Sequence, residues 1–469
     1  MRQKKQLIVK QVVVTDYAAE GKSLAKVDGK VIFITGAVPG DVADIRITRD
    51  KKDWAEGRAI YFHQYSAIRT EPFCKHFGIC GGCKWQMLPY EEQLKYKQRE
   101  VEEHLKRIGK IEMPPLLPIL GALETRFYRN KLEYTFCSKR YYTEEDFQHI
   151  RDGDSAAEPA LGYHVPRLFD KVIDIEECHL QADPSNAIRN AVKEIALSRQ
   201  FSFYDIRSHQ GWLRNLVIRT TTTGELMLNF CLGYPDEKNA RILFDEVLEL
   251  FPAITTLLYT INPKMNESTH DLDPQVYSGQ GFITEKMEDF QFRIGPKSFF
   301  QTNTRQGEQL YRVAREFAGL SGKEILFDLY CGTGSIGIFM SRLASRLVGV
   351  EVIEEAVKDA RINATLNGIE NASFFAGDVV DICQEDFFRQ QGRPDVVITD
   401  PPRAGMHGKL VSSLLDIAAP TVVYVSCNPA TQARDLALMD EKYRVTMIQP
   451  VDMFPHTHHI ENVVQLKLR

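Results

Sequence analysis

A chain of 469 residues, 43% hydrophobic and 26% charged, has the composition of a soluble globular protein and is too long for one ordinary core. The formal net charge of -5 gives no overall attraction to nucleic acid, so binding of that kind must come from local basic surface. Because no segment has the ~20 consecutive apolar residues of a membrane span and the N-terminal region shows no signal peptide pattern, we expect a cytoplasmic protein that binds no membrane.

Residues 1–65 are predicted to form short strands joined by tight turns. Asp28-Gly29 is a two-residue hairpin signal, and Pro39-Gly40 marks another turn. Several short strands at such close spacing predict a small β-barrel of the OB type, a fold that often binds nucleic acid. The fold by itself does not establish that activity.

Three cysteines follow in the motif CKHFGICGGC, namely Cys74, Cys80 and Cys83. Such a group can ligate zinc, ligate an iron–sulfur cluster or simply pack, and either kind of metal site needs a fourth ligand. The spacing is close to that of plant-type ferredoxins, with one more residue in the first gap. Cys178, in DIEECHL, is the best candidate for the fourth ligand. Nine cysteines without a secretory signal argue against a disulfide framework.

The rest of the region 66–290 has a mixed pattern. Residues 89–110 carry interspersed charges with scattered Leu, Tyr and Val, which predicts a helix with a solvated face. Residues 216–232 resemble strands, and residues 237–251 form an amphipathic helical pattern. We therefore expect an α+β region here.

From about residue 305 the pattern changes to strands that alternate with helices. This alternation predicts a parallel sheet with helices on both faces, and residues 443–454 and 461–469 predict an antiparallel edge. Ligands of such sheets bind beyond the carboxyl ends of the strands. The predicted parallel strands are 324–330, 346–351, 372–377, 395–400 and 421–426.

A glycine-rich turn, DLYCGTGSIGI, follows the first of these strands. Glu351 ends the next strand ~20 residues later, where an acid can accept hydrogen bonds from ribose hydroxyls. Asp328 precedes the turn and would repel a pyrophosphate, so NAD fits poorly. S-adenosylmethionine carries an ammonium and a sulfonium and fits better. Asp378 adds an acid after the third strand.

The last two parallel strands end in residues that can perform chemistry. Asp400 begins DPPRAG, where two prolines fix the backbone. Cys427 ends the neighbouring strand, so it is a candidate nucleophile rather than a packing residue. Glu461, in HTHHIENV, is a candidate base. The histidines of that motif could bind a metal, but they lack the usual paired carboxylate. They are His456, His458 and His459.

Together, FFQTN, DLYCGTG, DPPRAG, SCNPAT and HTHHIENV resemble the RNA (uracil-5-)-methyltransferase family, and the N-terminal barrel resembles the TRAM domain of its rRNA-directed members. The resemblance implies that Cys427 is the nucleophile and Glu461 the base. It implies a [4Fe-4S] cluster, rather than zinc, on Cys74, Cys80, Cys83 and Cys178. Ser335 is a departure, since many members have asparagine there. The implied cofactor positions are Gln301, Tyr330, Ser335, Glu351, Asp378 and Asp400.

We therefore expect three domains: an OB-like TRAM barrel (1–65), a central α+β domain with the cluster (66–290) and a Rossmann-like class I methyltransferase domain (291–469). The resemblance implies that a monomer methylates carbon 5 of a uridine in 23S rRNA through a cysteine adduct at carbon 6. A tRNA uracil-5 methyltransferase and a non-catalytic RNA-binding or RNA-folding protein are the alternatives. An RNA cytosine-5 methyltransferase is disfavoured. Those enzymes place a cysteine after the proline of the fourth-strand motif, whereas DPPRAG in this chain contains none.

Overall fold

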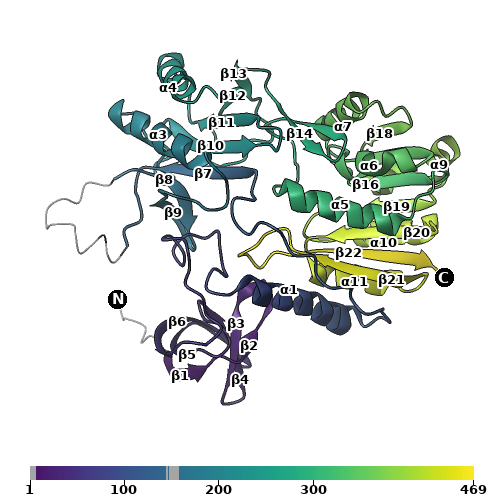
Figure 1. Cartoon of the computed structure of the whole chain (residues 1–469), viewed down its shortest axis with the longest axis horizontal. Coiled ribbons are helices and arrows are strands. Elements are labelled where there is room, and N and C mark those ends of the chain that lie inside the picture. The colour runs from purple at the N-terminus through teal and green to yellow at the C-terminus, as the bar shows by residue number, and fades with distance from the viewer. Residues whose placement is uncertain (1–6, 144–145, 147–157) are drawn as a thin grey trace.

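The structure, a computed structural model, describes residues 7–143, 146 and 158–469. Three regions, each built on its own sheet, surround the middle of the molecule (Figure 1). The N-terminal sheet lies at the lower left of the view, the central sheet at the upper left and the C-terminal sheet on the right. None of the helices in the described part of the chain has the length and apolarity needed to cross a membrane.

The N-terminal region is a six-stranded sheet in the order β1-β5-β6-β4-β3-β2. The predicted hairpin turn is confirmed: Asp28 and Gly29 both have positive φ, 49° and 81°, and they join β3 to β4. The inward side chains, among them Ile32, Ile34 and Ile45, form a core of their own. The strands are β1 (Ile8–Val13), β2 (Asp16–Tyr17), β3 (Ser23–Val27), β4 (Lys30–Thr35), β5 (Val42–Asp50) and β6 (Trp54–Gln64).

Helix α1 (Tyr90–His104) lies below the C-terminal sheet in Figure 1 and packs against α11 (Pro429–Met439). The predicted helix and its solvated face are confirmed. The opposite, buried face contains polar residues as well as apolar ones. Gln93 and Lys97 are completely buried beside Val101. Buried polar side chains need partners, and those of Gln93 and Lys97 lie in the C-terminal region.

The central region is a seven-stranded sheet in the order β13-β12-β11-β10-β7-β8-β9. Two helices, α3 (Ser185–Ser198) and α4 (Glu237–Leu250), pack together over it and share one core with it (Figure 1). The strands are β7 (Lys131–Cys137), β8 (Ala160–Val165), β9 (Leu168–Asp174), β10 (Leu213–Thr220), β11 (Leu226–Leu232), β12 (Thr256–Ile261) and β13 (Gln275–Ser278).

A hairpin, β14 (Ile283–Met287) and β15 (Phe290–Ile294), and helix α5 (Thr304–Ala318) lead into the C-terminal sheet, whose order is β18-β17-β16-β19-β20-β22-β21. The first five strands are parallel, as predicted. The antiparallel edge is also confirmed, with β22 between β20 and β21. The strands are β16 (Ile325–Leu329), β17 (Arg346–Glu351), β18 (Ala372–Ala376), β19 (Val396–Thr399), β20 (Thr421–Ser426), β21 (Tyr443–Val451) and β22 (Glu461–Leu468).

The strand order reverses at β16, because β17 pairs on one side of it and β19 on the other. A crevice forms at such a reversal, beyond the carboxyl ends of the strands. The helices of the sheet are α6 (Ser335–Met340), α7 (Glu354–Leu366), α8 (Val379–Ile382), α9 (Glu385–Gln391), α10 (Gly408–Ile417) and α11.

Candidate active site

Two buried acids face the glycine-rich turn. Asp328 is 1% exposed, and its Oδ2 accepts a 2.9 Å hydrogen bond from the Gly337 N–H, while its Oδ1 has no partner. Glu351 accepts hydrogen bonds from the N–H groups of Gly332 (3.1 Å) and Ile353 (2.9 Å). Burial, with Asp400 and Glu351 nearby, raises the pKa of Asp328 to about 7. A buried acid with an unpartnered oxygen fits a ligand that carries positive charge.

The other predicted cofactor residues surround the same turn. Tyr330 is half-buried with a φ of 61°, and burial, then the charge of exposed Asp378, raise its pKa. Ser335 Oγ lies 2.8 Å from the hydroxyl of Tyr311, a buried residue of α5. Gln301 also lies beside that hydroxyl. Tyr311 therefore links Gln301 to Ser335, and no sequence motif marks it.

Cys427, Asp400 and Glu461 come together at one edge of the sheet. Cys427 follows β20 and is half-buried, Asp400 follows the adjacent β19, and Glu461 opens β22, which pairs with β20 on its other side. Burial raises the pKa of both carboxyls, and Asp400 raises that of Glu461 further. Burial, then Glu461 and Asp400, raise the pKa of Cys427 to about 11, while Arg403 acts in the opposite direction. The resting thiol is therefore protonated at neutral pH.

The DPPRAG loop is fixed by contacts to α11 and β20. Asp435 Oδ2 accepts hydrogen bonds from the Met406 N–H (2.8 Å) and the Tyr424 hydroxyl (2.7 Å). Asn428 Nδ2 donates to the carbonyl of Arg403 (3.1 Å). These contacts hold Arg403, whose side chain is exposed, next to the cysteine strand.

The three histidines of HTHH lie near this edge of the sheet, and their rings are neutral. Burial lowers the pKa values of His456, His458 and His459 to about 4, 3 and 4. The rings of His458 and His459 lie 4.2 Å apart, and Nδ1 of His456 lies 3.1 Å from the amide nitrogen of Gln93. The contact to α1 therefore engages Nδ1 of His456, while its buried Nε2 has no hydrogen-bond partner.

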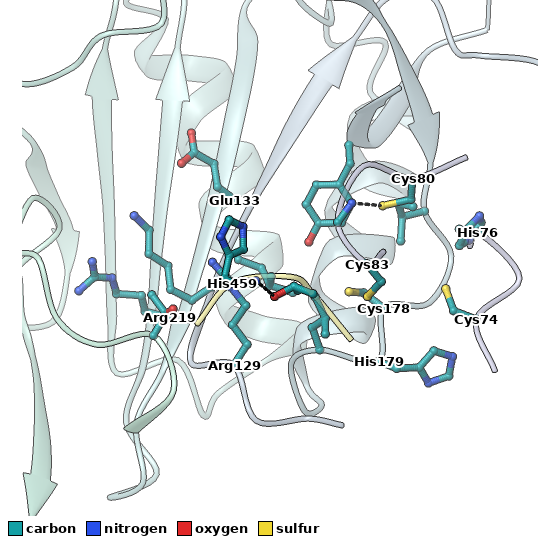
Figure 2. A pocket seen from close by; sticks show the side chains of 18 of the residues that line it. Cys74, His76, Cys80, Cys83, Arg129, Glu133, Cys178, His179, Arg219 and His459 are labelled. Carbon is teal, nitrogen blue, oxygen red and sulfur yellow. Dashed lines mark hydrogen bonds between the residues drawn. The ribbon is translucent and has the colours of Figure 1, made fainter. Parts of the chain in front are cut away.

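All four predicted metal-ligating cysteines line one cavity of about 610 Å³, between the central region and the C-terminal region (Figure 2). The Gly82 N–H donates to Cys80 Sγ (3.4 Å), and all four thiols are free of disulfides. Within residues 7–143, 146 and 158–469, however, no group of three or more His, Cys, Asp or Glu side chains is arranged as a metal site. The structure brings the four cysteines to one cavity without closing them into a coordination shell.

The other side of this cavity is basic and partly aromatic. Arg129, Lys131, Arg219 and Lys297 line it, and Figure 2 shows Arg129 and Arg219 across from the cysteines. Phe299, which also lines it, is 70% exposed. The cavity includes His459, so it adjoins the loop that carries Glu461. Arg219 is buried, and Glu133 and Glu177 also line the cavity, so the basic surface consists of Arg129, Lys131 and Lys297. A local basic surface is what a chain with a net charge of -5 requires for binding nucleic acid.

The sequence of this chain matches known proteins and domains. Residues 275–469 match the family described as tRNA (Uracil-5-)-methyltransferase, and residues 8–60 match the TRAM domain. An uncharacterized RNA methyltransferase of Bacteroides thetaiotaomicron is 53% identical over 96% of this chain and 100% of its own length. One from Porphyromonas gingivalis is 50% identical, over 97% and 98%.

A solved structure covers nearly the whole chain as well. The Pyrococcus abyssi tRNA (uracil-54, C5)-methyltransferase, in complex with S-adenosyl-L-homocysteine, has a TM-score of 0.73 and 28% identity, and the match covers 97% of this chain and 100% of that one. The chain belongs to the RNA (uracil-5-)-methyltransferase family.

As an RNA (uracil-5-)-methyltransferase, the protein uses S-adenosylmethionine to methylate carbon 5 of uracil in RNA. The non-catalytic alternative and the cytosine-5 alternative are thereby set aside. The site fits this cofactor, since its ammonium and sulfonium meet a crevice with buried acids, Asp328 above all.

Sequence reasoning did not identify several residues of this methyltransferase site. Arg403 is part of the DPPRAG motif, but that it lowers the pKa of Cys427 depends on how the loop folds. Tyr311, Gln93 and Lys97 lie on helices whose patterns are ordinary, and only the tertiary contacts reveal them.

Proposed function

We propose that this enzyme methylates a uridine of 23S rRNA, with Cys427 as nucleophile and Glu461 as base, and that it acts as a monomer whose three domains divide near residues 65 and 290. The observation that carries the proposal is the meeting of Cys427, Asp400 and Glu461 beside the acid-lined crevice. Thiol and carboxylate at one strand edge are what addition to uracil and proton removal require.

The proposed cofactor contacts follow from the crevice. S-adenosylmethionine supplies an electrophilic methyl group when bound. Glu351 is placed to accept from the ribose hydroxyls, since it already holds the N–H of Gly332 in the turn. Asp328 would neutralise the amino group. The remaining proposed contacts are Gln301, Tyr330, Ser335, Asp378 and Asp400.

The proposed reaction begins with Cys427. Stacked RNA hides carbon 6, so the uridine must flip into the site, at a cost of a few kcal/mol. The thiol then loses its proton to solvent, helped by the positive charge of Arg403. Its sulfur electron pair forms a bond to carbon 6, which leaves an enolate. Carbon 5 of the enolate would then accept the methyl group, as the methyl–sulfonium bond breaks and the cofactor leaves as neutral S-adenosyl-L-homocysteine.

Glu461 completes the cycle. Carbon 5 is saturated after methylation and carries both a hydrogen and the new methyl group. The ionised Glu461 takes that proton, the electron pair forms the carbon 5–carbon 6 double bond, and the carbon 6–sulfur bond breaks to return the thiolate. Burial and Asp400 favour the protonated form of Glu461, so this step requires that Glu461 first loses its proton. The proton that it takes from carbon 5 passes to solvent after product leaves.

We also propose that Cys74, Cys80, Cys83 and Cys178 hold a [4Fe-4S] cluster. The support is the chemistry of the donor set, since four free cysteines line one cavity. Burial acts against ligation, because it raises the pKa of the Cys80 thiol to about 11 and that of the Cys83 thiol to about 12. A metal must displace these protons. The cluster would tie the segment after the N-terminal sheet to the central region, with zinc as the weaker alternative.

The choice of RNA has two candidates. The TRAM match and the four cysteines support rRNA, as the family resemblance implies. A tRNA target is favoured by one specific observation, the similarity to the Pyrococcus abyssi enzyme, which acts on uracil 54 of tRNA. Either RNA fits a cavity with Arg129, Lys131, Arg219 and Lys297, since phosphate contacts alone do not read sequence.

The target is tested by mapping 5-methyluridine in 23S rRNA and in tRNA from cells that lack the protein. We expect one or more rRNA sites to lose the mark and to regain it with the native gene but not with Cys427→Ala. Loss of the mark in tRNA alone would establish the second candidate and reject the first. Cys383→Ala, a buried cysteine distant from the proposed chemistry in the sequence, is the matched control and should restore the mark.

The roles of the two residues are tested with purified protein. RNA with 5-fluorouridine and S-adenosylmethionine should give a covalent protein–RNA adduct with the native enzyme and none with Cys427→Ala. Glu461→Gln should methylate natural RNA but retain it as an adduct. Rapid release of product by Glu461→Gln would remove Glu461 from the base role.

A further inference from the structure

The segment that carries Glu461 into the site is the connection between β21 and β22, residues 452–460. Val451 and Glu461 are register partners at the open end of this hairpin. Asp452 follows Val451 directly, and the connection returns to the sheet at Glu461. The path of residues 452–460 therefore decides where the Glu461 carboxylate stands.

Helix α1, which belongs to the N-terminal part of the chain, holds the middle of this connection. Gln93 Oε1 accepts a 2.8 Å hydrogen bond from the His456 N–H, and Gln93 Nε2 lies 3.1 Å from His456 Nδ1. The same Nε2 donates to the carbonyls of Trp85 (3.0 Å) and Leu88 (2.8 Å). His456 has a φ of 64°, which a non-glycine residue adopts only under constraint. Gln93 thus holds a strained point of the connection.

One helical turn further along α1, Lys97 holds the beginning of the 452–460 connection. Lys97 Nζ donates to Asp452 Oδ1 (2.6 Å) and to the Phe454 carbonyl (3.1 Å), and Tyr90 donates to Asp452 Oδ2 (2.8 Å). The side chains of Lys97 and Asp452 are both 0% exposed. An apolar pair could fill this space at no loss of stability. The ion pair instead fixes the path of the backbone from Asp452 to Phe454, since its hydrogen bonds can form along only one such path.

The opposite side of the connection is held from α5. Asn303 Nδ2 donates to the Met453 carbonyl (2.9 Å), and Gln306 Nε2 donates to the Asp452 carbonyl (2.9 Å). The C-terminal region therefore supplies only one half of the support. Support from outside that region comes from the side chains of Gln93 and Lys97. The N–H groups of Lys84 (2.8 Å) and Trp85 (3.1 Å) also donate to the His456 carbonyl, and the Tyr128 hydroxyl donates to the Pro455 carbonyl (3.0 Å).

We propose that Gln93 and Lys97 are positioning residues for Glu461: they fix the 452–460 connection so that the carboxylate meets the hydrogen on carbon 5 of the methylated adduct. This inference rests on the proposed function, in which Glu461 is the base. Because they act on Glu461 through the connection, their main effect should fall on the release of the adduct.

The test uses the full-length enzyme and total RNA from cells that lack the protein. Methyl transfer is followed with tritiated S-adenosylmethionine, and the adduct is followed as protein–RNA conjugate on a denaturing gel. In Gln93→Leu we expect methyl transfer within about twofold of native and adduct release slower by about tenfold or more, because a small misplacement of a catalytic group costs up to ~100-fold. Gln93→Glu keeps the acceptor for the His456 N–H but loses the amide that donates to the carbonyls of Trp85 and Leu88, so it should recover the release rate only in part.

Gln98→Leu is the matched control. Gln98 lies on the same helix, but its Oε1 accepts from the Ile119 N–H (2.9 Å) and it does not contact residues 452–460. It should leave adduct release unchanged. If Gln93→Leu slows both steps equally, or if Gln98→Leu retains the adduct to the same extent, the positioning role is overturned.

Two further variants keep the result decisive. Lys97→Met combined with Asp452→Leu replaces the ion pair by an apolar one and should also retain the adduct. Asp452 also accepts from the Tyr90 hydroxyl and the Phe454 N–H, so chemical denaturation is used to show that this variant is folded. Glu461→Gln is run in parallel. If it releases product rapidly, the proposed function and the positioning role fail together, whereas retention by Glu461→Gln but not by Gln93→Leu overturns the positioning role alone.

Discussion

At the scale of single residues, the site is a balance of charges that oppose one another. Glu461 and Asp400 favour the protonated state of Cys427, and Asp400 favours that of Glu461, because a buried negative charge beside another is costly. Arg403 is the group near Cys427 that favours the thiolate. Reactivity of the thiol should therefore depend on this arginine and on the protonation of the acids.

Replacing Arg403 tests that balance directly. Arg403→Gln removes the positive charge, so the pKa of Cys427 should rise and its alkylation by iodoacetamide at about pH 8 should slow ~3- to 10-fold, which corresponds to a shift of about half to one pKa unit. Arg403→Lys retains the charge and should react nearly as the native protein does. The rate is measured by mass spectrometry of the peptide that contains Cys427. Equal rates for the two variants would contradict the role of the charge.

Cofactor affinity should depend on pH through Asp328. Its pKa is raised to about 7, chiefly by burial, so the carboxyl is largely neutral at lower pH and ionised at higher pH. Only the ionised form attracts a cationic cofactor, so affinity for S-adenosylmethionine should increase between about pH 6 and pH 8, at up to ~10-fold per unit.

Calorimetric titration measures this affinity. Asp328→Asn should bind more weakly and with little dependence on pH over the same range. A native affinity that is flat across the range would show that Asp328 does not meet the charge of the cofactor.

At the scale of elements, the DPPRAG loop connects the chemistry to the helix behind it. Asp435, on α11, holds both Met406 of the loop and Tyr424 of β20. Gly405 lies in this loop with a φ of 79°, against the side chains of Arg434 and Asp435. The loop therefore has little space for a larger side chain at position 405.

Gly405→Ala should disturb it. The added Cβ would lie 2.7 Å from Arg434 Nη2 and 2.7 Å from Asp435 Oδ2, and the positive φ adds strain, for a total cost of about 1–3 kcal/mol in the free energy of unfolding. Adduct formation by Cys427 should slow as Asp400 and Arg403 shift. Gly408→Ala, whose Cβ meets nothing within 4 Å, is the control. Chemical denaturation and the 5-fluorouridine adduct assay measure the two effects, and equal behaviour of the variants would contradict the strain.

The elements also show what the sequence could and could not predict. The alternation of strands and helices predicted the parallel sheet, and strand ends therefore predicted that Asp400 and Cys427 would be neighbours. Gln93 and Lys97 were not identified, because a buried glutamine and lysine look the same in sequence as the solvated residues around them. Their partners, His456 and Asp452, lie more than 350 residues away. Local patterns carry no information about contacts at that separation.

At the scale of the whole molecule, the cysteine cavity joins parts that the sheets keep separate. Cys74, Cys80 and Cys83 come from the segment after the N-terminal sheet, and Cys178 comes from the segment before α3 in the central region. A cluster held by all four would cross-link these segments beside the basic wall of the cavity. Its loss should affect the stability of the molecule before it affects the chemistry.

Cys178→Ser tests this cross-link. The variant should lose iron and acid-labile sulfide and unfold about 5 °C or more below the native protein in anaerobic buffer, since removing a structural metal site costs several kcal/mol. Cys137→Ser is the matched control, because Cys137 is also buried but its thiol faces the Lys139 carbonyl. Native iron content and an unchanged Tm in Cys178→Ser would contradict the proposed ligand.

The position of β22 has a consequence for how the protein is made. Glu461–Leu468 is synthesised after every other strand of its sheet, yet it lies between β20 and β21, which pair with it and not with each other. While the ribosome is still translating earlier residues, both strands have an unpaired edge, and Glu461 does not yet exist beside Cys427. A nascent chain can therefore bury most of its core and still lack Glu461, the proposed base. The moment at which the enzyme becomes competent is set by the arrival of this one strand.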